Sequence, residues 1–407
     1  MNVLEVKNTS CVALILLALM ACDQNQNETV ADVAVTTFDN KSGSDSKLSA
    51  AMQRHELNDS ENELYARFSY QPLQGLGYEK GIHRRDPSSI IKVGDLYYVW
   101  YTRSQDPKLS WLNADIWYAT SKDGITWQEQ SAAVKRGVKG EYDDLSVFTT
   151  NILVADGKYY LTYQAEKKGG YEINVIAMAK ADSPDGPWTK FLKPILTPTY
   201  DGQWKPHPKW ENKLVTVKSG SWDSRMVHDP AVIPRFGKYW LYYKAHGLGD
   251  AMWADSKWGV AVSDHPEGPY IKSPMNPITN SGHEVWVWPW KKGIAAIVDW
   301  AGPEKSTVQY SNDGINFHVR STLEDVPPAG GAYIADKFDD PENGQGFSWG
   351  LAHYGRSDWA FLVRFDTQLK QGMKKDFSWR KFPHYSTIRD VMVDPKRFSL
   401  PYSSLQK

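Results

Sequence analysis

The sequence predicts an all-β protein, a five-bladed β-propeller preceded by a short pair of helices. Two observations favour this fold. A turn followed by an aromatic strand recurs along the chain, and after each copy comes a second strand that ends in a Gly turn and an aromatic residue. Helical periodicity is almost absent from this region. Blades of short antiparallel strands joined by tight turns produce such a pattern.

The repeated unit has two recognisable parts. Its first part reads GDLYYVWY, GKYYLTY and GKYWLYY, starting at Gly94, Gly157 and Gly237. Its second part reads DGITW, DGPW, EGPY and DGINF. A β-sandwich is the main competing fold, but it would not repeat this phrase along its whole length. Counting the units predicts five blades, over residues 86–130, 145–190, 225–272, 280–320 and 330–382.

Composition excludes several classes of function. The 407 residues include 47 Lys and Arg against 48 Asp and Glu, a formal net charge of −1. No excess of positive charge can hold a phosphate backbone or an anionic membrane surface, so we expect no nucleic-acid partner. Both cysteines, Cys11 and Cys22, precede the folded part, which excludes a disulfide framework and a Cys-ligated zinc site there. We expect no organic cofactor. Most of the 18 Trp and 22 Tyr should fill the β core, and a few should stack on a sugar.

The first 22 residues are typical of a lipoprotein signal peptide. The apolar run VALILLALMA over residues 12–21 is too short to span a bilayer as a helix but suits a signal-peptide core. LMAC, which ends at Cys22, is similar to a bacterial lipoprotein cleavage box, in which Cys22 becomes the lipidated first residue. Ordinary secretion is the alternative. We therefore expect an exported cell-envelope protein, facing the periplasm or anchored in the outer membrane, that contacts the membrane only through a lipid anchor.

Two segments separate this leader from the propeller. Residues 23–46, rich in Asn, Asp, Ser and Thr, are too poor in apolar residues to fold and indicate a flexible tether. Residues 47–70 favour two short helices, with a break at residues 58–60, NDS. A helix pair of this size is not stable alone and must pack on its own body or on a partner subunit. The propeller domain is then predicted over residues 71–407.

Candidate catalytic residues lie where the innermost strand of a blade is expected to begin, because such strand starts converge on one funnel at the axis. Blade one opens with HRRDPS, which contains Asp86, and blade three with VHDPA, which contains Asp229. Blade four opens with SGHEVW, which contains His283 and Glu284. An Asp-Pro step can simply start a strand. Two such steps at matched positions, with a His and a Glu beside them, favour a catalytic site instead.

Cleavage of a glycosidic bond needs such a set of groups. An inverting enzyme holds an acid and a base about 6.5–9.5 Å apart, so that a water fits below the anomeric carbon. One carboxylate would act as the base, a second would raise the pKa of the acid, and the acid would protonate the leaving oxygen. A histidine can be the acid if a neighbouring anion keeps it protonated. His283 and Glu284 should point to opposite faces of a strand, so only one of them would face the funnel.

Over most of the chain after the leader, the sequence resembles glycoside hydrolase family 117. The stretch SAAMQR, which contains Ser49, Ala51 and Arg54, is similar to the SxAxxR motif of that family's N-terminal helix pair, which is exchanged between two subunits. The resemblance implies a five-bladed propeller, a homodimer and one divalent metal ion near the axis without a catalytic role. It also implies an exo-acting, inverting α-1,3-L-neoagarooligosaccharide hydrolase, which releases 3,6-anhydro-L-galactose from the non-reducing end of neoagaro-oligosaccharides.

The resemblance also implies roles for single residues. RRDPS matches Asp86 to the general base, HDP matches Asp229 to the pKa-modulating carboxylate, and GHEVW matches His283 to the general acid. Five-bladed arabinanases and xylosidases use a Glu as the acid, which leaves Glu284 as an alternative. The two arginines among the expected substrate contacts could equally be structural ion-pair partners of Asp86 or Asp229. The expected substrate contacts are Arg85, Arg103, Thr149, Gln164, His228 and Glu284, together with Trp111, His246 and Trp258, which we expect in loops.

Three functions are open at this point. The first is the neoagaro-oligosaccharide hydrolase with the roles above. The second keeps the fold and the reaction type but acts on an arabinan, a xylan or another galactan, with Glu284 as the acid. The third is a lipid-anchored propeller that binds a glycan without cleaving it. Two carboxylates at the funnel floor argue against the third, because a lectin does not need them, and the SxAxxR-like stretch favours the first over the second.

Overall fold

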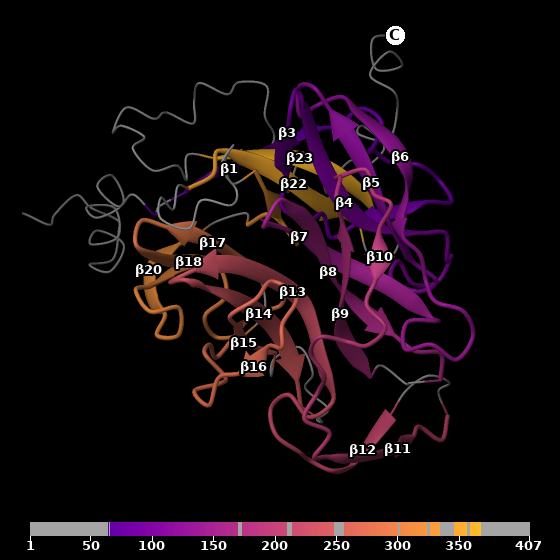
Figure 1. The fold of residues 1–407 in the computed structure, drawn as a ribbon, viewed down its shortest axis with the longest axis vertical. Coiled ribbons are helices and arrows are strands. Elements are labelled where there is room, and N and C mark those ends of the chain that lie inside the picture. The colour runs from indigo at the N-terminus through magenta and orange to yellow at the C-terminus, as the bar shows by residue number, and fades with distance from the viewer. Residues whose placement is uncertain are drawn as a thin grey trace, which may run out of the picture. The chain divides into compact units, whose positions relative to one another are not determined.

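The computed structural model confirms the predicted five-bladed propeller. Five sheets stand around a central axis in Figure 1. The residues that the structure describes form 23 strands and no helix, and none of them belongs to a helix long and apolar enough to cross a bilayer. The structure describes residues 64, 66–169, 173–209, 214–247, 256–299, 302–323, 326–333, 346–355 and 359–367.

In the first four blades the strands pair antiparallel from the axis outward in chain order, except that in blade one both β2 and β3 pair with β4. Blade one consists of β2 (His83–Arg85), β3 (Ile91–Val93), β4 (Leu96–Ser104), β5 (Asp115–Ser121) and β6 (Trp127–Val134). Blade two consists of β7 (Ser146–Ala155), β8 (Lys158–Glu166), β9 (Asn174–Ala181) and β10 (Thr189–Lys190). Blade three consists of β13 (Met226–Arg235), β14 (Lys238–His246), β15 (Lys257–Ser263) and β16 (Ile271–Lys272). Blade four consists of β17 (Trp286–Trp290), β18 (Gly293–Val298), β19 (Thr307–Ser311) and β20 (His318–Thr322).

The fifth blade closes the ring with a strand from the other end of the propeller. It consists of β21 (Gly331–Ala332), β22 (Trp349–Tyr354), β23 (Phe361–Thr367) and β1 (Phe68–Pro72). β1 pairs antiparallel with β23, with Phe68 opposite Thr367. The last three residues of the predicted helical segment, 68–70, therefore lie in a strand, because Phe68 and Tyr70 alternate into the aromatic core beside Trp286. β1 thereby becomes the outermost strand of the fifth blade, and its pairing with β23 closes the ring.

Local turn chemistry explains the second part of the repeated phrase. Asp123 Oδ1 accepts hydrogen bonds from Ile125 N at 2.8 Å and from Thr126 N at 2.7 Å, and Gly124 takes the left-handed position at φ +70. In blade four, Asp313 Oδ1 accepts the two equivalent bonds at 2.9 and 2.8 Å. An Asp side chain that bonds its own backbone two and three residues on fixes a tight turn.

Aromatic side chains fill the space between neighbouring blades, as expected for most of the tryptophans. Trp100, Trp258, Trp288 and Trp290 are fully buried. Trp286 of blade four stacks on Phe347 of blade five with ring centroids 5.3 Å apart. Each large ring removes about 150–250 Å² of surface from water, so these contacts hold the blades against one another. The inner strands are thereby fixed around the axis.

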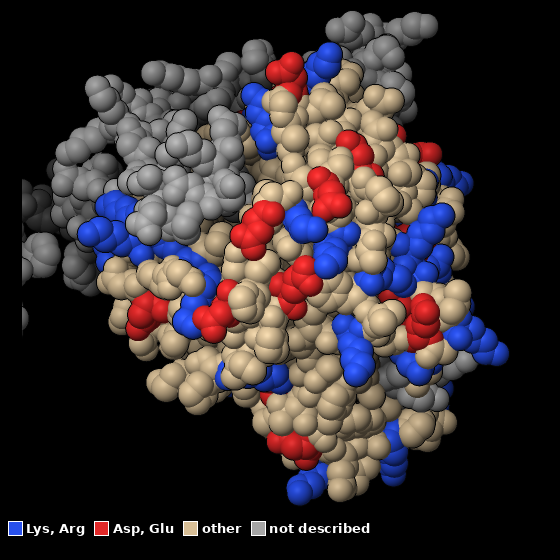
Figure 2. All heavy atoms as spheres, viewed as in Figure 1, with Lys and Arg blue, Asp and Glu red and all other residues tan. Residues whose placement is uncertain are grey.

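The chain forms a small hairpin between blades two and three, which the repeats do not predict. Its strands are β11 (Gln203–Pro206) and β12 (Leu214–Lys218), which pair only with each other. In Figure 1 the hairpin lies outside the ring of blades. On the face drawn in Figure 2, basic and acidic side chains are intermixed, so that face carries no extended surface of one charge sign.

Candidate active site

The innermost strands share one irregularity near the axis. Asp86 (φ 49), Thr149 (φ 43), Asp229 (φ 52) and Ala329 (φ 47) adopt the left-handed backbone conformation at matched places in blades one, two, three and five. The strand register shifts at these places in β7 and β13, and in blade one β2 ends just before Asp86. A non-glycine residue in this conformation costs about 1–3 kcal/mol, and such residues cluster at active sites.

The irregularity corrects one expectation. Asp229 lies within β13 and not at its start, because residues 226–228 already pair with β14. The register shift between His228 and Ala231 takes Asp229 out of the regular alternation of the strand. Asp229 therefore reaches the axis from the body of the strand, as Asp86 does from the end of β2.

A hollow lies at the axis, and residues of all five blades line it. Its acidic lining consists of Asp86 from blade one, Asp229 from blade three and Glu284 from the turn before blade four. Thr149 lines it from blade two and Ala329 from blade five. The structure thus brings together three carboxyl groups that are 143 and 55 residues apart in the chain (229 − 86 and 284 − 229).

Asp86 is buried and held by charged and polar partners. Arg85 donates to it from Nε at 2.7 Å and from Nη2 at 3.1 Å. His353 Nδ1 lies 3.1 Å from its Oδ1, and the Thr149 hydroxyl donates to its Oδ2 at 3.2 Å. Burial alone would raise the pKa of this carboxyl, but Arg85 and His353 hold the pKa below its ordinary value. Asp86 is therefore ionised at neutral pH, as a general base must be.

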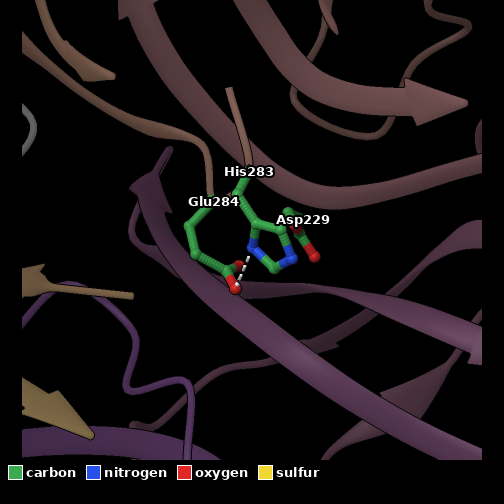
Figure 3. Close-up of side chains that lie close together, drawn as sticks. All are labelled: Asp229, His283 and Glu284. Atoms are coloured by element: carbon green, nitrogen blue, oxygen red, sulfur yellow. Dashed lines mark ion pairs between the residues drawn. The ribbon is translucent and has the colours of Figure 1, made fainter. Parts of the chain in front are cut away.

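Asp229, His283 and Glu284 form a second group, the acidic cluster (Figure 3). One polar atom of each lies within 4.8 Å of the others, and His283 Nδ1 is 2.8 Å from Glu284 Oε1. Burial and the charge of Glu284 raise the pKa of Asp229 well above its ordinary value, against the effect of Lys244. Burial would also raise the pKa of Glu284, but His283 and Lys244 hold it well below its ordinary value. At neutral pH Glu284 is thus ionised and unsuited to donate a proton.

The turn before β17 carries both His283 and Glu284. Strand alternation would place their side chains on opposite faces, but residues 281–285 are not in a strand, so alternation does not apply. Both side chains reach the cluster: Glu284 lines the hollow, and His283 pairs with its carboxylate. Asp299 Oδ1 accepts a hydrogen bond from His283 N at 3.3 Å. Gly282, at φ +132, lies directly on the Trp258 indole and completes the support of the turn.

Gly282→Ala is expected to destabilise the fold by about 2–4 kcal/mol and to lower activity. The added Cβ would lie 2.2 Å from Trp258 Nε1, in a backbone conformation that side chains rarely adopt. Gly237→Ala is the matched control, because a Cβ there meets nothing within 4 Å at φ +69, and we expect a loss of only about 1 kcal/mol. Denaturant unfolding of both variants checks this. Equal losses would show that Trp258 does not hold the turn.

Comparison with solved structures identifies the family. Zg3597, a family 117 glycoside hydrolase produced by the marine bacterium Zobellia galactanivorans, is 36% identical to this chain in sequence. The two match with a TM-score of 0.64, over 77% of this chain and 93% of that chain. The chain belongs to glycoside hydrolase family 117. It is therefore a glycosidase of the β-propeller class, as the resemblance in its sequence implied.

More distant proteins share the fold of this family 117 chain. The model for glycosyl hydrolases family 43 matches residues 81–205. A structure described as a glycoside hydrolase is 13% identical, with a TM-score of 0.53 over 79% of this chain and 96% of that chain. At such an identity the likeness concerns the fold alone. No curated protein sequence matches the chain.

Three of the expected substrate contacts adjoin the acidic cluster of the family 117 site. Gln164 Nε2 lies 3.2 Å from His228 Nδ1, and the rings of His228 and His246 have centroids 4.9 Å apart. Burial, followed by the charge of Lys244, lowers the pKa of His228 well below its ordinary value, so this ring is neutral. His228 directly precedes Asp229 in β13. These side chains form a polar wall beside the charged groups.

The other expected contacts have different surroundings. Arg103 stacks over Trp117 at 4.2 Å, and its Nε is 3.4 Å from Glu129 Oε1. Arg103 thus has an ion-pair partner, but this partner is neither Asp86 nor Asp229. Arg85 does pair with Asp86, and its guanidinium lies 5.4 Å from the ring of Trp111.

The sequence predicts that Trp258 contacts the substrate from a loop. In the structure Trp258 lies in β15 and is fully buried. Its indole supports Gly282 and presents no face to a sugar. The expectation of a loop was wrong for Trp258, because residues 257–263 pair with β14 as the third strand of blade three, and for His246, which is the last residue of β14.

Two charged or polar residues of the site, Lys244 and His353, are not among those predicted from the sequence. Both are buried, Lys244 against Asp229 and His353 against Asp86. Each interrupts a strand of apolar and aromatic residues, LYYKAH and WGLAHY. A Lys or His in such a strand is costly to bury without a partner, and this was the signal that could have revealed them.

The divalent ion that the resemblance implies can be tested against the donor atoms present. Among the described residues, the group that could offer three ligand atoms is Asp229, His283 and Glu284. Glu284 is already paired with His283, and Asp229 holds the Lys244 ammonium group. A divalent cation there would lie beside a buried ammonium group, so these side chains do not fit a metal site. The ion near the axis stays a prediction.

Several expectations fall outside the described residues. These concern the lipidation of Cys22, the tether over residues 23–46 and the helix pair with Ser49, Ala51 and Arg54. The lipid anchor, the envelope location and the exchanged-helix homodimer therefore stay predictions.

Proposed function

We propose that the chain is an exo-acting, inverting glycoside hydrolase that releases 3,6-anhydro-L-galactose from the non-reducing end of neoagaro-oligosaccharides. One observation carries the chemical part of this proposal. An ionised carboxylate, Asp86, shares a hollow with Asp229 and Glu284, and Glu284 pairs with the His283 imidazole beside it. A base and an acid on the two sides of a bound sugar are what hydrolysis by direct displacement requires.

In the proposed reaction Asp86 accepts a proton from water while the water oxygen attacks the anomeric carbon. His283 gives its proton to the glycosidic oxygen as the carbon–oxygen bond breaks, so charge balances in one displacement and the anomeric centre inverts. The Glu284 carboxylate, 2.8 Å from His283 Nδ1, keeps the imidazole protonated until then. Asp229 modulates the acid from its place beside the ring.

The exo mode and the substrate have separate support. Residues of every blade converge on the hollow at the axis, which suits a site for one chain end. The sugar itself is inferred from the likeness of RRDPS, HDP, GHEVW and SAAMQR to family 117 motifs. Membership of family 117 supports that inference.

Product analysis tests the substrate. Purified protein is incubated with neoagarobiose, with arabinan and xylan oligosaccharides run in parallel, and the products are followed by thin-layer chromatography. We expect galactose and 3,6-anhydro-L-galactose from neoagarobiose alone. Cleavage of another glycan instead would keep the mechanism and refute the substrate. Binding by calorimetry without cleavage of any glycan would favour a sugar-binding propeller.

A further inference from the structure

Lys244 is a buried charge near the end of the second strand of blade three. It lies in β14, between Tyr243 and Ala245, and only 3% of its side chain is exposed. Removing an ammonium group from water costs several kcal/mol unless a partner compensates. The partner is the equally buried carboxylate of Asp229, whose Oδ2 contacts Lys244 Nζ.

The strand register places Lys244 between the strand that carries Asp229 and the strand that supports the turn with His283 and Glu284. It lies opposite His228, the residue before Asp229, on one side and opposite Trp258 on the other. Trp258 in turn supports Gly282, which precedes His283 and Glu284. Lys244 thus pairs both with the strand that carries Asp229 and with the strand whose Trp258 supports the turn that carries His283 and Glu284.

The charges of the site also require Lys244. Arg85 compensates Asp86, and His283 compensates Glu284. Asp229 and Glu284 offer oxygens within 4.8 Å of each other, so they repel strongly when both are ionised. Lys244 is the cation that contacts Asp229 among the described residues.

We propose that Lys244 is a positioning residue of the hydrolytic site: its ammonium group fixes the Asp229 carboxylate and allows Asp229 and Glu284 to flank the His283 imidazole. The inference rests on the proposed function, and it adds a residue to which the sequence resemblance gives no role. The titratable and charged groups around Lys244 and its partner are His228 and Asp229 on β13, His246 on β14, His283 and Glu284 before β17, and Arg85 on β2.

The sign of the effect on pH dependence follows from the charge. Lys244→Met removes a positive charge beside the acid, so the acid keeps its proton to higher pH. The alkaline limb of the kcat/KM profile should therefore move to higher pH. The acid limb, set by Asp86, should stay in place, because the groups that contact Asp86 are Arg85, His353 and Thr149 and not Lys244. A merely structural role for Lys244 would lower the rate without moving one limb alone.

Kinetics of three full-chain variants test the proposal. Lys244→Met should lower kcat at least tenfold with a smaller change in KM and move the alkaline limb up, whereas Lys244→Arg should recover part of kcat and restore the limb. Lys238→Met is the matched control: Lys238 lies at the other end of β14 with an exposed partner, Asp264, and should leave the profile unchanged. A Lys244→Met enzyme within twofold of the wild type in kcat, with the same profile, would overturn the proposal.

Thermal unfolding keeps this test separate from the substrate assignment. Lys244→Met should lower Tm by on the order of 5 °C, because it leaves a buried carboxylate without a partner. Adding Asp229→Asn to Lys244→Met should recover part of that loss, because the unpaired charge is then gone. If the wild type cleaves no glycan, the proposed function fails, while recovery in the double variant still supports the ion pair. No recovery would overturn the role of Lys244 even in an active enzyme.

Discussion

Asp86→Asn is expected to lower kcat by about 10²–10⁴-fold while the protein stays folded and still binds its sugar. Asparagine keeps the size of the side chain and can still accept hydrogen bonds from Arg85 and Thr149, but it cannot take a proton from water. Initial rates on neoagarobiose and calorimetric binding to the same sugar check the two parts of this prediction.

Asp182→Asn is the matched control for the loss of the base. Asp182 is exposed, pairs with Lys158 at 3.1 Å and lies outside the hollow, so its rate should equal that of the wild type. Turnover by Asp86→Asn at the rate of this control would show that Asp86 is not the base. Loss of binding together with turnover would instead indicate that Asp86 holds the sugar.

The second prediction with a large expected effect shows whether His283 or Glu284 is the general acid. His283→Gln should lower kcat on neoagarobiose by about 10²–10⁴-fold, because glutamine cannot protonate the leaving oxygen. The loss should be much smaller on an aryl glycoside whose dinitrophenolate leaves without a proton. Initial rates on the two substrates provide the comparison.

Glu284→Gln should have a smaller effect with a diagnostic pH dependence. Its carboxylate lies 2.8 Å from His283 Nδ1 and stabilises the charged imidazole. Without it His283 releases its proton at lower pH, so the alkaline limb of kcat/KM should move down, opposite to the shift expected for Lys244→Met. Inactivation by Glu284→Gln, with His283→Gln retaining most of its rate, would contradict the assignment and make Glu284 the acid.

The fold was predictable because the signals of a propeller are local. A few consecutive residues specify a turn such as that at Asp123 and Gly124, and these turns recur with the aromatic strands that they join. The pairing of β1 with β23 was not predictable in this way. Phe68 and Thr367 are 299 residues apart (367 − 68), and nothing within either strand specifies the other.

The site was predictable in part for a related reason. Asp86 and Asp229 follow the same local pattern, an Asp-Pro step on an inner strand, and the structure brings both to one hollow. The orientation of His283 and Glu284 could not be read from the sequence, because Trp258 and Asp299 fix that turn from other strands. Lys244 could not be identified from the sequence for the same reason, because its role depends on Asp229 in the neighbouring strand.

A crystal structure of Asp86→Asn with neoagarobiose bound would be the most decisive test of the proposed mechanism. We expect the anhydrogalactose ring in the hollow, with the glycosidic oxygen about 2.6–3.2 Å from His283 and a water between Asn at position 86 and the anomeric carbon. A sugar bound outside the hollow, or a glycosidic oxygen that contacts Glu284 and not His283, would refute the mechanism.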